Sequence, residues 1–313
     1  MSTSLEPGLP GLSVTHEMGR SVRVQYGTVE LARYVYRPWE PQLEAPRPYL
    51  HPLRTLGGEL VSLYRPHDDR WHKGMTWAVP NIGDQNFWGG PTFVRDQGYV
   101  QLPNNGAIVH RAFDLLDARP ERVSIHERLE WITQGGATWF TEARTLAFTV
   151  RDDAWVMTFG TRFTNVSGTP AVFGSPTTKG RPNAGYGGLF WRGPRSFAGG
   201  TVRLPDRCGT DDLMGERAPW LAFTGRHDED GASSTLVFVD AVDNRGHPTQ
   251  WFVRSGLYGG AGPAPFFDEE VAVADGASLA FRYAVVVADG DRGRLGTESL
   301  ALAGRAALGA AGE

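Results

Sequence analysis

The sequence predicts an all-β protein, a large antiparallel β-sandwich with a short helix near its C-terminal end. Three observations support this fold class. Segments that alternate apolar and polar residues recur along most of the 313 residues. Forty glycines and 21 prolines are spread through the chain, as expected where many short strands are joined by turns. Because 41% of the residues are hydrophobic, the chain can also bury a large core.

The N-terminal part predicts a β-hairpin. Apolar residues alternate from Val22 to Tyr26, Gly27 supplies the turn, and the alternation resumes from Val29 to Tyr36. Residues 39–52 contain four prolines and predict an extended loop. Residues 59–63 follow a Gly-Gly turn and predict a further strand.

The clearest strand pattern covers residues 108–166. It predicts a meander of three long strands, with turns at residues 134–136 and 151–153. Three charged residues, Glu127, Glu142 and Arg144, fall on the apolar faces of these strands. A buried charge needs a partner, neutralisation or a cavity, because an unpaired one is costly. We therefore expect these residues to be paired or to face a site.

The C-terminal part predicts more strands and one helix. An Ala/Leu-rich segment, 296–311, begins with the capping residues Thr297, Glu298 and Ser299. About twenty strands without an internal repeat favour two sheets packed face to face. We expect a flexible segment at residues 1–19 and a single domain at residues 20–313. The further strands are predicted at 220–224, 235–240, 250–253, 270–274 and 279–287.

Composition argues against several partners. The net charge is −4, and no run of Lys and Arg suits a phosphate backbone, so we expect no nucleic acid. The longest apolar run, 283–288, is too short to cross a membrane as a helix. Residues 1–11 lack the pattern of a signal peptide. The single cysteine, Cys208, allows no internal disulfide and suits a reducing compartment, so we expect a cytoplasmic protein.

The histidines differ in their surroundings. His67 and His72 share a short loop with two aspartates, a tryptophan and a lysine, a mixture that suits proton transfer or polar recognition. His51 lies in a proline-containing loop beside Arg54, which could direct both side chains inward. His110 ends an apolar strand and is predicted to face a cleft. The residues expected to face solvent are His16, His126 and His227.

Two further features suggest a polar pocket. His247 lies shortly before Trp251 and Arg254. Three tryptophans lie beside polar residues in predicted loops, where indole rings suit the flat faces of sugars. They are Trp71, Trp88 and Trp191, whereas Trp131 and Trp155 are expected in the core.

The usual cofactor and metal motifs are missing. No GxSxG elbow, phosphate-binding P-loop or dinucleotide fingerprint occurs in the sequence. The spacing of His67 and His72 does not match a zinc motif. We therefore expect no cofactor and no metal. Sequence spacing alone leaves open a metal site built from distant loops, such as His51, His72 and a carboxylate.

Four short segments together resemble the DUF6807 family, whose members are often labelled "PmoA family". The resemblance covers roughly residues 20–290, and the segments are 48–54, 67–74, 86–90 and 251–254. Many members carry a histidine-rich run where this chain has only His67 and His72, which weakens a metal assignment. The resemblance implies a galactose mutarotase-like supersandwich that acts on, or binds, a sugar.

This resemblance gives the expected roles. In a mutarotase-like reaction one group takes the anomeric hydroxyl proton while another protonates the ring oxygen. We expect an isomerase or epimerase acting on a sugar-like small molecule. The alternatives are a lyase or hydrolase, with or without a metal, acting on an oxidised sugar, glycoside or natural-product intermediate, and a non-catalytic sugar-binding module. The expected catalytic residues are His72, His67, His110 and Glu142, and the expected substrate ligands are His51, Arg54, Asn86, Trp88, Arg192, His247 and Arg254.

Overall fold

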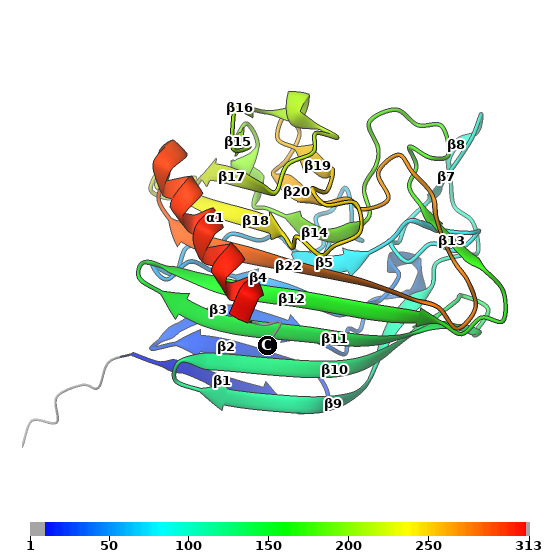
Figure 1. Cartoon of the computed structure of the whole chain (residues 1–313), viewed down its shortest axis with the longest axis horizontal. Coiled ribbons are helices and arrows are strands. Elements are labelled where there is room, and N and C mark those ends of the chain that lie inside the picture. The colour runs from blue at the N-terminus through cyan, green and yellow to red at the C-terminus, as the bar shows by residue number, and fades with distance from the viewer. Residues whose placement is uncertain (1–9, 311–313) are drawn as a thin grey trace, which may run out of the picture.

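The computed structural model describes residues 10–310 and shows two large antiparallel sheets that lie face to face (Figure 1). In order of hydrogen-bonded neighbours, the eight-stranded sheet contains β1 (Leu12–Glu17), β2 (Ser21–Tyr26), β3 (Val29–Val35), β4 (Tyr49–Leu53), β5 (Met75–Ala78), β14 (Gly188–Arg192), β20 (Gly260–Pro263) and β19 (Trp251–Arg254). The nine-stranded sheet contains β16 (Cys208–Gly209), β15 (Thr201–Arg203), β17 (Trp220–Arg226), β18 (Ser233–Asp240), β22 (Ser278–Asp289), β12 (Ala154–Asn165), β11 (Thr138–Arg151), β10 (Arg122–Ile132) and β9 (Ala107–Arg119).

Smaller elements surround the two sheets. A three-stranded sheet contains β21 (Val271–Val273), β13 (Ala171–Gly174) and β6 (Asn81–Ile82), and a hairpin contains β7 (Thr92–Val94) and β8 (Gly98–Val100). The short 3₁₀ helices are η1 (Gln42–Glu44), η2 (Arg195–Phe197) and η3 (Asp211–Leu213). The helix α1 (Gly293–Ala310) follows β22. No helix in residues 10–310 is long and apolar enough to cross a membrane.

Aromatic side chains between the sheets form the centre of the main core. Trp77 of β5 stacks on Phe159 of β12, with ring centroids 6.0 Å apart, and also contacts Phe281 of β22. Trp191 of β14 packs against Phe223 of β17, and both side chains are fully buried. These contacts join strands of opposite sheets, as expected for a sandwich. The predicted all-β sandwich is therefore confirmed.

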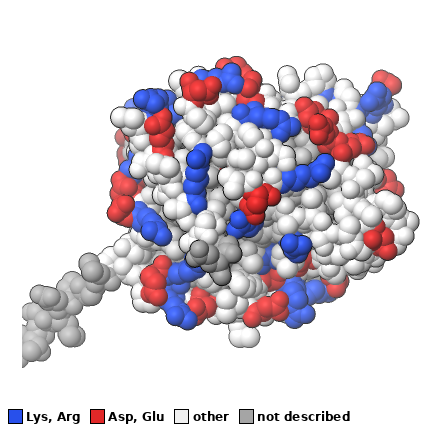
Figure 2. Space-filling view, in the orientation of Figure 1, with Lys and Arg blue, Asp and Glu red and all other residues white. Residues whose placement is uncertain are grey.

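The helix α1 lies across the outer face of the nine-stranded sheet (Figure 1). Leu300 and Leu308 are buried there with Val239 and Val286, in a cluster separate from the main core. Gly304 faces the sheet, where a Cβ atom would lie only 2.7 Å from a methyl group of Val239. Figure 2 shows acidic and basic side chains interspersed on the face that carries α1. That face therefore lacks the single-sign patch that would attract a highly charged partner.

The buried charges predicted on the central strands are paired. Arg144 donates to Glu142 from Nε at 2.8 Å and to the hydroxyl of Tyr34 at 3.3 Å. Glu127 accepts a hydrogen bond from Tyr34 and lies 2.6 Å from Nδ1 of His110. Because Tyr34 belongs to β3 and the other four residues to β9, β10 and β11, this buried polar network connects the two sheets.

Most of the predicted strands are present, with four differences. Residues 49–52, expected in an extended loop, belong to β4. The meander has four strands, because the first predicted strand turns at Pro120 and continues as a hairpin of β9 and β10. Residues 59–63 form no strand and make one isolated bridge, between Leu60 and Arg54. Residues 12–17, expected in a flexible segment, form β1 and pair with β2. Residues 1–9 of that expected segment lie outside the described residues.

Candidate functional site

An aromatic-lined pocket of about 400 Å³ lies on the outer face of the eight-stranded sheet. Side chains alternate along a strand, so Phe190 and Arg192 of β14 face away from the main core that holds Trp191. We call this cavity the aromatic pocket. Its lining residues are Asp68, Asp69, Trp71, His72, Trp88, Gly89, Pro91, Tyr99, Arg181, Tyr186, Phe252, Arg254, Leu257 and Tyr258.

Arg47 links two loops that carry pocket residues. Arg47 is almost fully buried and donates to the main-chain carbonyl groups of Trp71 and Trp88, each at 2.8 Å. Gly90, at φ +68°, lies so close to the ring of Trp71 that a Cβ atom would approach it to 2.5 Å. The two tryptophans are therefore held at fixed positions in the pocket wall.

A buried ionic cluster supports the loop of residues 65–73. Arg65 donates two hydrogen bonds to Glu44, at 2.6 and 2.8 Å, and Lys73 binds the same carboxylate. Burial opposes the ionisation of Glu44, but the hydrogen bonds from Arg65 and Lys73 lower its pKa. Burial lowers the pKa of Lys73 to about 8. With its charges paired, this cluster fixes the loop that carries His72.

His72 and Asp69 form a polar pair in the pocket wall. Oδ2 of Asp69 lies 3.8 Å from Nδ1 of His72, and this buried nitrogen has no hydrogen-bond partner among the described residues. Burial, followed by the charge of Arg192, lowers the pKa of His72 well below its usual value. Burial raises the pKa of Asp69, against the opposing effect of Arg192. At neutral pH the imidazole is therefore neutral and can accept a proton.

Arg192 lies behind the pocket wall. Its side chain is fully buried, and none of its guanidinium nitrogens has a hydrogen-bond partner in residues 10–310. Its Cζ atom lies 3.6 Å from the centre of the Tyr258 ring, and Tyr258 lines the pocket. Burial lowers the pKa of Arg192. Burial also raises the pKa of Tyr258 to about 12, against the effect of Arg192.

Aromatic rings form most of the apolar wall. Trp88 packs against Tyr186 and Phe190, with ring centroids 4.6 and 4.9 Å apart, and its edge meets the ring of His72. Tyr186 also contacts Phe252 of β19. Flat apolar surfaces beside polar groups suit a ring with hydroxyl groups.

Four predicted site residues lie in or beside this pocket. His72, Trp88 and Arg254 line it, and Arg192 lies behind Tyr258. Arg254 donates to the main-chain carbonyl of Asn183 at 3.0 Å. The sequence placed these residues in separate segments, and the fold of the sheet brings them together.

Asn86 does not face the pocket as a ligand. Its Oδ1 accepts from the main-chain nitrogens of Trp88 and Gly89, at 2.8 and 2.9 Å, and its Nδ2 donates to Thr92 at 3.0 Å. It is almost fully buried, so it shapes the loop that carries Trp88.

Three other predicted site residues do not line the aromatic pocket. His67 is exposed, and its Nδ1 lies 3.1 Å from Arg195. His51 lies 2.8 Å from Ser62 and stacks on Tyr64, and burial lowers its pKa to about 4. Arg54 donates to the carbonyl of Gly58 at 3.0 Å.

The other three predicted residues have partners inside the sandwich. His110 and Glu142 belong to the buried polar network, where Glu142 also accepts from Trp131 at 2.6 Å and from Thr161 at 2.8 Å. His247, in the loop after β18, lies 2.8 Å from Asp240. None of these three lines the aromatic pocket.

Two predictions about where a side chain lies were wrong. His227 is buried, lies 2.7 Å from Ser234 and packs on Phe197. It directly follows the last residue of β17, which places its ring against the η2 turn. Trp191, expected in a loop beside polar residues, lies in β14 and donates to the carbonyl of Val61 at 2.7 Å. Its indole ring belongs to the main core.

Sequence reasoning missed Asp69 and Tyr258 as individual site residues. Asp69 lies in the polar segment that suggested a site, but the catalytic roles were assigned to its neighbours His67 and His72. Tyr258 lies between Gly256 and Gly259 in the turn that joins β19 and β20, and that glycine-rich turn was the available signal.

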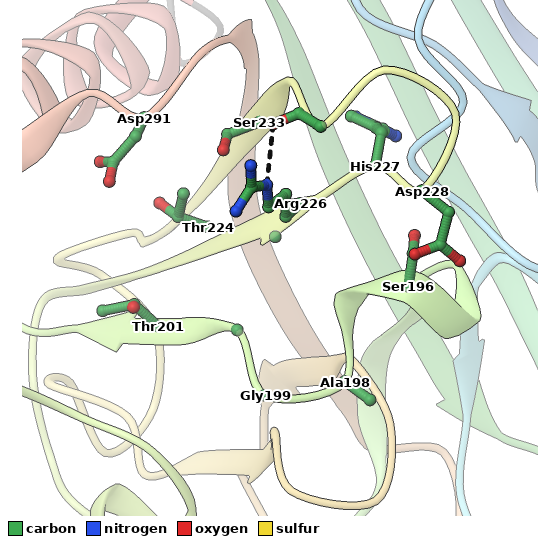
Figure 3. A pocket seen from close by; sticks show the side chains of 13 residues that line it. Ser196, Ala198, Gly199, Thr201, Thr224, Arg226, His227, Asp228, Ser233 and Asp291 are labelled. Atoms are coloured by element: carbon green, nitrogen blue, oxygen red, sulfur yellow. Dashed lines mark hydrogen bonds between the residues drawn. The ribbon is translucent and has the colours of Figure 1, made fainter.

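A second, polar pocket of about 600 Å³ lies near the start of α1 (Figure 3). Its labelled side chains include Thr201, Thr224 and Asp291, and no aromatic ring lines it apart from the imidazole of His227. Arg226 there donates to the carbonyl of Gly231 at 2.9 Å. Since its histidine and arginine already have protein partners, this pocket offers less for catalysis than the aromatic pocket.

Within residues 10–310, no three His, Cys, Asp or Glu side chains are grouped so that they could hold a metal ion. His51 and His72, the pair considered for a distant-loop site, have different surroundings: His51 contacts Ser62 and Tyr64, whereas His72 contacts Trp88 and Tyr258. Cys208 is exposed.

A family model described as "Family of unknown function (DUF6807)" matches residues 21–301. The chain belongs to the DUF6807 family. The resemblance found in the four short segments is therefore confirmed, and the match covers nearly all strands of both large sheets. A search of curated proteins found no match in sequence.

Solved structures with similar folds include sugar-related proteins. The GH36 α-galactosidase AgaB from Geobacillus stearothermophilus is 11% identical with a TM-score of 0.45, covering 90% of the DUF6807 chain, which spans only 41% of the galactosidase. A putative aldose 1-epimerase from Klebsiella pneumoniae is 10% identical with a TM-score of 0.35, covering 95% and 84% of the two chains. A galactose mutarotase-like protein from Clostridium acetobutylicum is 9% identical with a TM-score of 0.36, covering 89% and 99%.

At these identities the similarity says nothing about the residues of the aromatic pocket. The functional proposal for this DUF6807 protein is therefore built on the pocket itself.

Proposed function

We propose that this chain is a carbohydrate-active enzyme that isomerises a sugar-like small molecule in the aromatic pocket by acid–base catalysis. The observation that carries the proposal is the pair of Asp69 and His72. Both lie in the pocket wall, and burial shifts the pKa of the acid upward and that of the base downward. Titratable groups with shifted pKa values in an aromatic cleft are typical of a catalytic site.

The pocket suits a sugar in size and chemistry. A volume of about 400 Å³ lies within the usual range for small-ligand sites. Trp71, Trp88 and Phe252 offer apolar surfaces for the faces of a ring. Asp68 and Arg254 are placed at the same cavity to hydrogen-bond hydroxyl groups.

The reaction needs two proton transfers. In one direction, neutral His72 removes the proton from the anomeric hydroxyl, and the acid form of Asp69, which burial favours, donates a proton to the ring oxygen. The bond between the ring oxygen and the anomeric carbon breaks, and the anomeric C–O bond becomes a carbonyl. Rotation about the adjacent C–C bond and the reverse transfers close the ring as the other anomer. Atoms and protons balance, and no cofactor enters the step.

The expected pair differs from the one predicted by sequence. From the sequence we predicted the second role for His67, but that side chain is exposed and lies beside Arg195, outside the pocket lining. Asp69 lies 3.8 Å from Nδ1 of His72 and lines the same cavity. We therefore assign the acid role to Asp69.

The test is the interconversion of anomers. Freshly dissolved α-anomers of D-galactose, D-glucose and their uronic acids are followed by polarimetry and by NMR exchange, with and without protein. We expect acceleration by the native protein and a loss of about 10²- to 10⁴-fold in Asp69→Asn and in His72→Asn. The control is His126→Asn, because His126 is exposed on β10.

The outcomes separate the alternatives. Equal rates with native protein and with a double Asp69→Asn, His72→Asn variant would overturn the proposed function. Binding of these sugars without any reaction would favour a sugar-binding module. Consumption of a glycoside or an oxidised sugar that depends on His72, without anomer exchange, would favour a hydrolase or lyase.

A further inference from the structure

Arg192 has no role in the reaction proposed above, although a buried cation without a partner is costly. Its side chain is fully buried, and Asp68 and Asp69, the acids that influence its pKa, lie beyond ion-pair distance. A buried, unpaired charge destabilises a fold by several kcal/mol. Such a group persists where a partner arrives from outside, and the partner for a guanidinium is an anion.

The backbone at Arg192 is firmly held. Its main-chain nitrogen donates to Gly74 at 2.7 Å, its carbonyl accepts from Leu63 at 2.9 Å, and it pairs with Gly260 of β20. The guanidinium therefore cannot reach solvent through a shift of the strand. Access to it requires a movement of the Tyr258 ring, which lies 3.6 Å from Cζ and lines the pocket.

Tyr258 lies on a turn that can allow this movement. The turn of residues 255–259 joins β19 to β20, and Leu257 at its tip is 83% exposed. Asp211 holds the start of the turn through the main-chain nitrogen of Ser255, at 2.5 Å. No described residue makes a hydrogen bond to the main chain of Leu257 or Tyr258. The base of the turn is thus fixed while the ring is held mainly by stacking.

Charge around the pocket also favours an anion. Four arginines, Arg181, Arg192, Arg195 and Arg254, surround a cavity whose acidic residues are Asp68 and Asp69. Asp68 is already paired with Arg195 at 2.9 Å.

We propose that the ligand of the aromatic pocket is an acidic sugar, whose carboxylate displaces the Tyr258 ring and pairs with Arg192. A carboxylate suits one guanidinium, since its two oxygens match two N–H groups. A phosphate dianion would need a second buried cation, and the two others near the pocket, Arg47 and Lys73, already bind main-chain carbonyls and Glu44. The sugar part of this ligand rests on the proposed function, whereas the carboxylate rests on Arg192 and on the arginines around the pocket.

The first experiment measures binding by calorimetry and needs no turnover. D-Galacturonate and D-glucuronate are compared with D-galactose, D-glucose and D-galactose 6-phosphate. We expect the native protein to bind a uronate about 10- to 100-fold more tightly than its neutral hexose, and Arg192→Gln to abolish this preference. Arg119→Gln, which changes an exposed arginine at the end of β9, should keep it.

Several results would overturn the acidic-sugar proposal. These are equal affinity for uronate and hexose, preference for the phosphate, no binding of any sugar, or a uronate preference that survives Arg192→Gln. Isomerisation of neutral hexoses without a uronate preference would leave the proposed function standing while this proposal falls. Arg192-dependent uronate binding without isomerisation would overturn the proposed function, while the pairing of a carboxylate with Arg192 would stand.

A second experiment tests the Tyr258 ring as the cover of Arg192. Phenylglyoxal modifies accessible arginines, and peptide mass spectrometry locates the modified positions. We expect slow modification of Arg192 in native protein, fast modification in Tyr258→Ala, and protection of that variant by D-galacturonate. Fast modification of Arg192 in native protein, or no change on replacing Tyr258, would contradict the covering role.

Discussion

Arg47 donates a hydrogen bond to the carbonyl oxygen of Trp88 at 2.8 Å, and the same guanidinium also binds the carbonyl of Trp71. Burial lowers the pKa of Arg47 to about 9, against the favourable influence of Glu40 and Glu44. One buried side chain thus fixes two rings of the aromatic pocket from loops that lie 17 positions apart in sequence.

Replacing this residue should loosen the pocket before it unfolds the protein. Arg47→Met leaves the carbonyls of Trp71 and Trp88 without their donor, so we expect a loss of about 2–4 kcal/mol of unfolding free energy and a clear loss of ligand affinity. Urea unfolding and calorimetry measure the two effects. Arg20→Met, at an exposed position, is the control. Unchanged affinity in a folded Arg47→Met protein would refute the positioning role.

Stability should fall in mild acid because His51 is partly buried and its pKa is lowered, which keeps the imidazole neutral. Its pKa is about 4 in the folded protein and about 6.5 in an unfolded chain. The stabilisation is complete above pH 6.5 and is lost as the pH falls toward 4, because the unfolded chain binds the proton first. The shift corresponds to about 3 kcal/mol. His72 is shifted in the same direction.

The comparison of native protein with His51→Gln isolates this effect. Urea unfolding is measured at pH 7 and at pH 4. The unfolding free energy that is lost between the two pH values should be about 3 kcal/mol smaller in the variant. Identical pH profiles would show that His51 does not resist protonation in the folded state.

Glu142 should matter for folding rather than for chemistry. It accepts from Arg144, Trp131 and Thr161 in the buried polar network. Glu142→Gln leaves Arg144 without its ionic partner, and we expect a loss of about 3–5 kcal/mol of unfolding free energy. At temperatures where the variant is folded, its sugar affinity per folded molecule should match that of the native protein. A stable but inactive variant would restore the catalytic role that the sequence suggested.

Replacing Arg192 should raise the free energy of unfolding, whereas replacing Glu142 should lower it. Its guanidinium has no hydrogen-bond partner among the described residues, so Arg192→Met removes an uncompensated buried charge while losing the stacking on Tyr258. We expect a gain of about 1–3 kcal/mol of unfolding free energy in urea. A loss of that size would mean that Arg192 is a structural residue with a partner.

The strands were largely predictable because period-2 alternation is a local property of the sequence. The row of Val123, Ile125, Leu129 and Trp131 is buried as predicted, and β17, β18, β21 and β22 lie within a few residues of their predicted bounds. The turn at Pro120 was missed because no glycine or asparagine marks it. β1 was missed because its partner, β2, had already been assigned to the first hairpin.

The site was predictable only in part, because burial and pairing are set by distant strands. The polar segment from His67 to Trp88 contributes Asp68, Asp69, Trp71, His72 and Trp88 to the lining of the aromatic pocket. Sequence spacing did not reveal that Glu127, rather than a substrate, meets His110, since the two positions become neighbours through the β9–β10 hairpin. The side chain of Tyr258 reaches the pocket from a turn 186 positions after His72 in sequence.

The buried polar network has a consequence for how relatives of this chain diverge. Tyr34 reaches across from one sheet to bind Glu127 and Arg144 of the other. A change at any one of the three leaves a donor or acceptor stranded in the core, so the substitutions that survive should occur together. Positions 34, 127 and 144, distant in sequence, are therefore expected to co-vary as a single inherited unit.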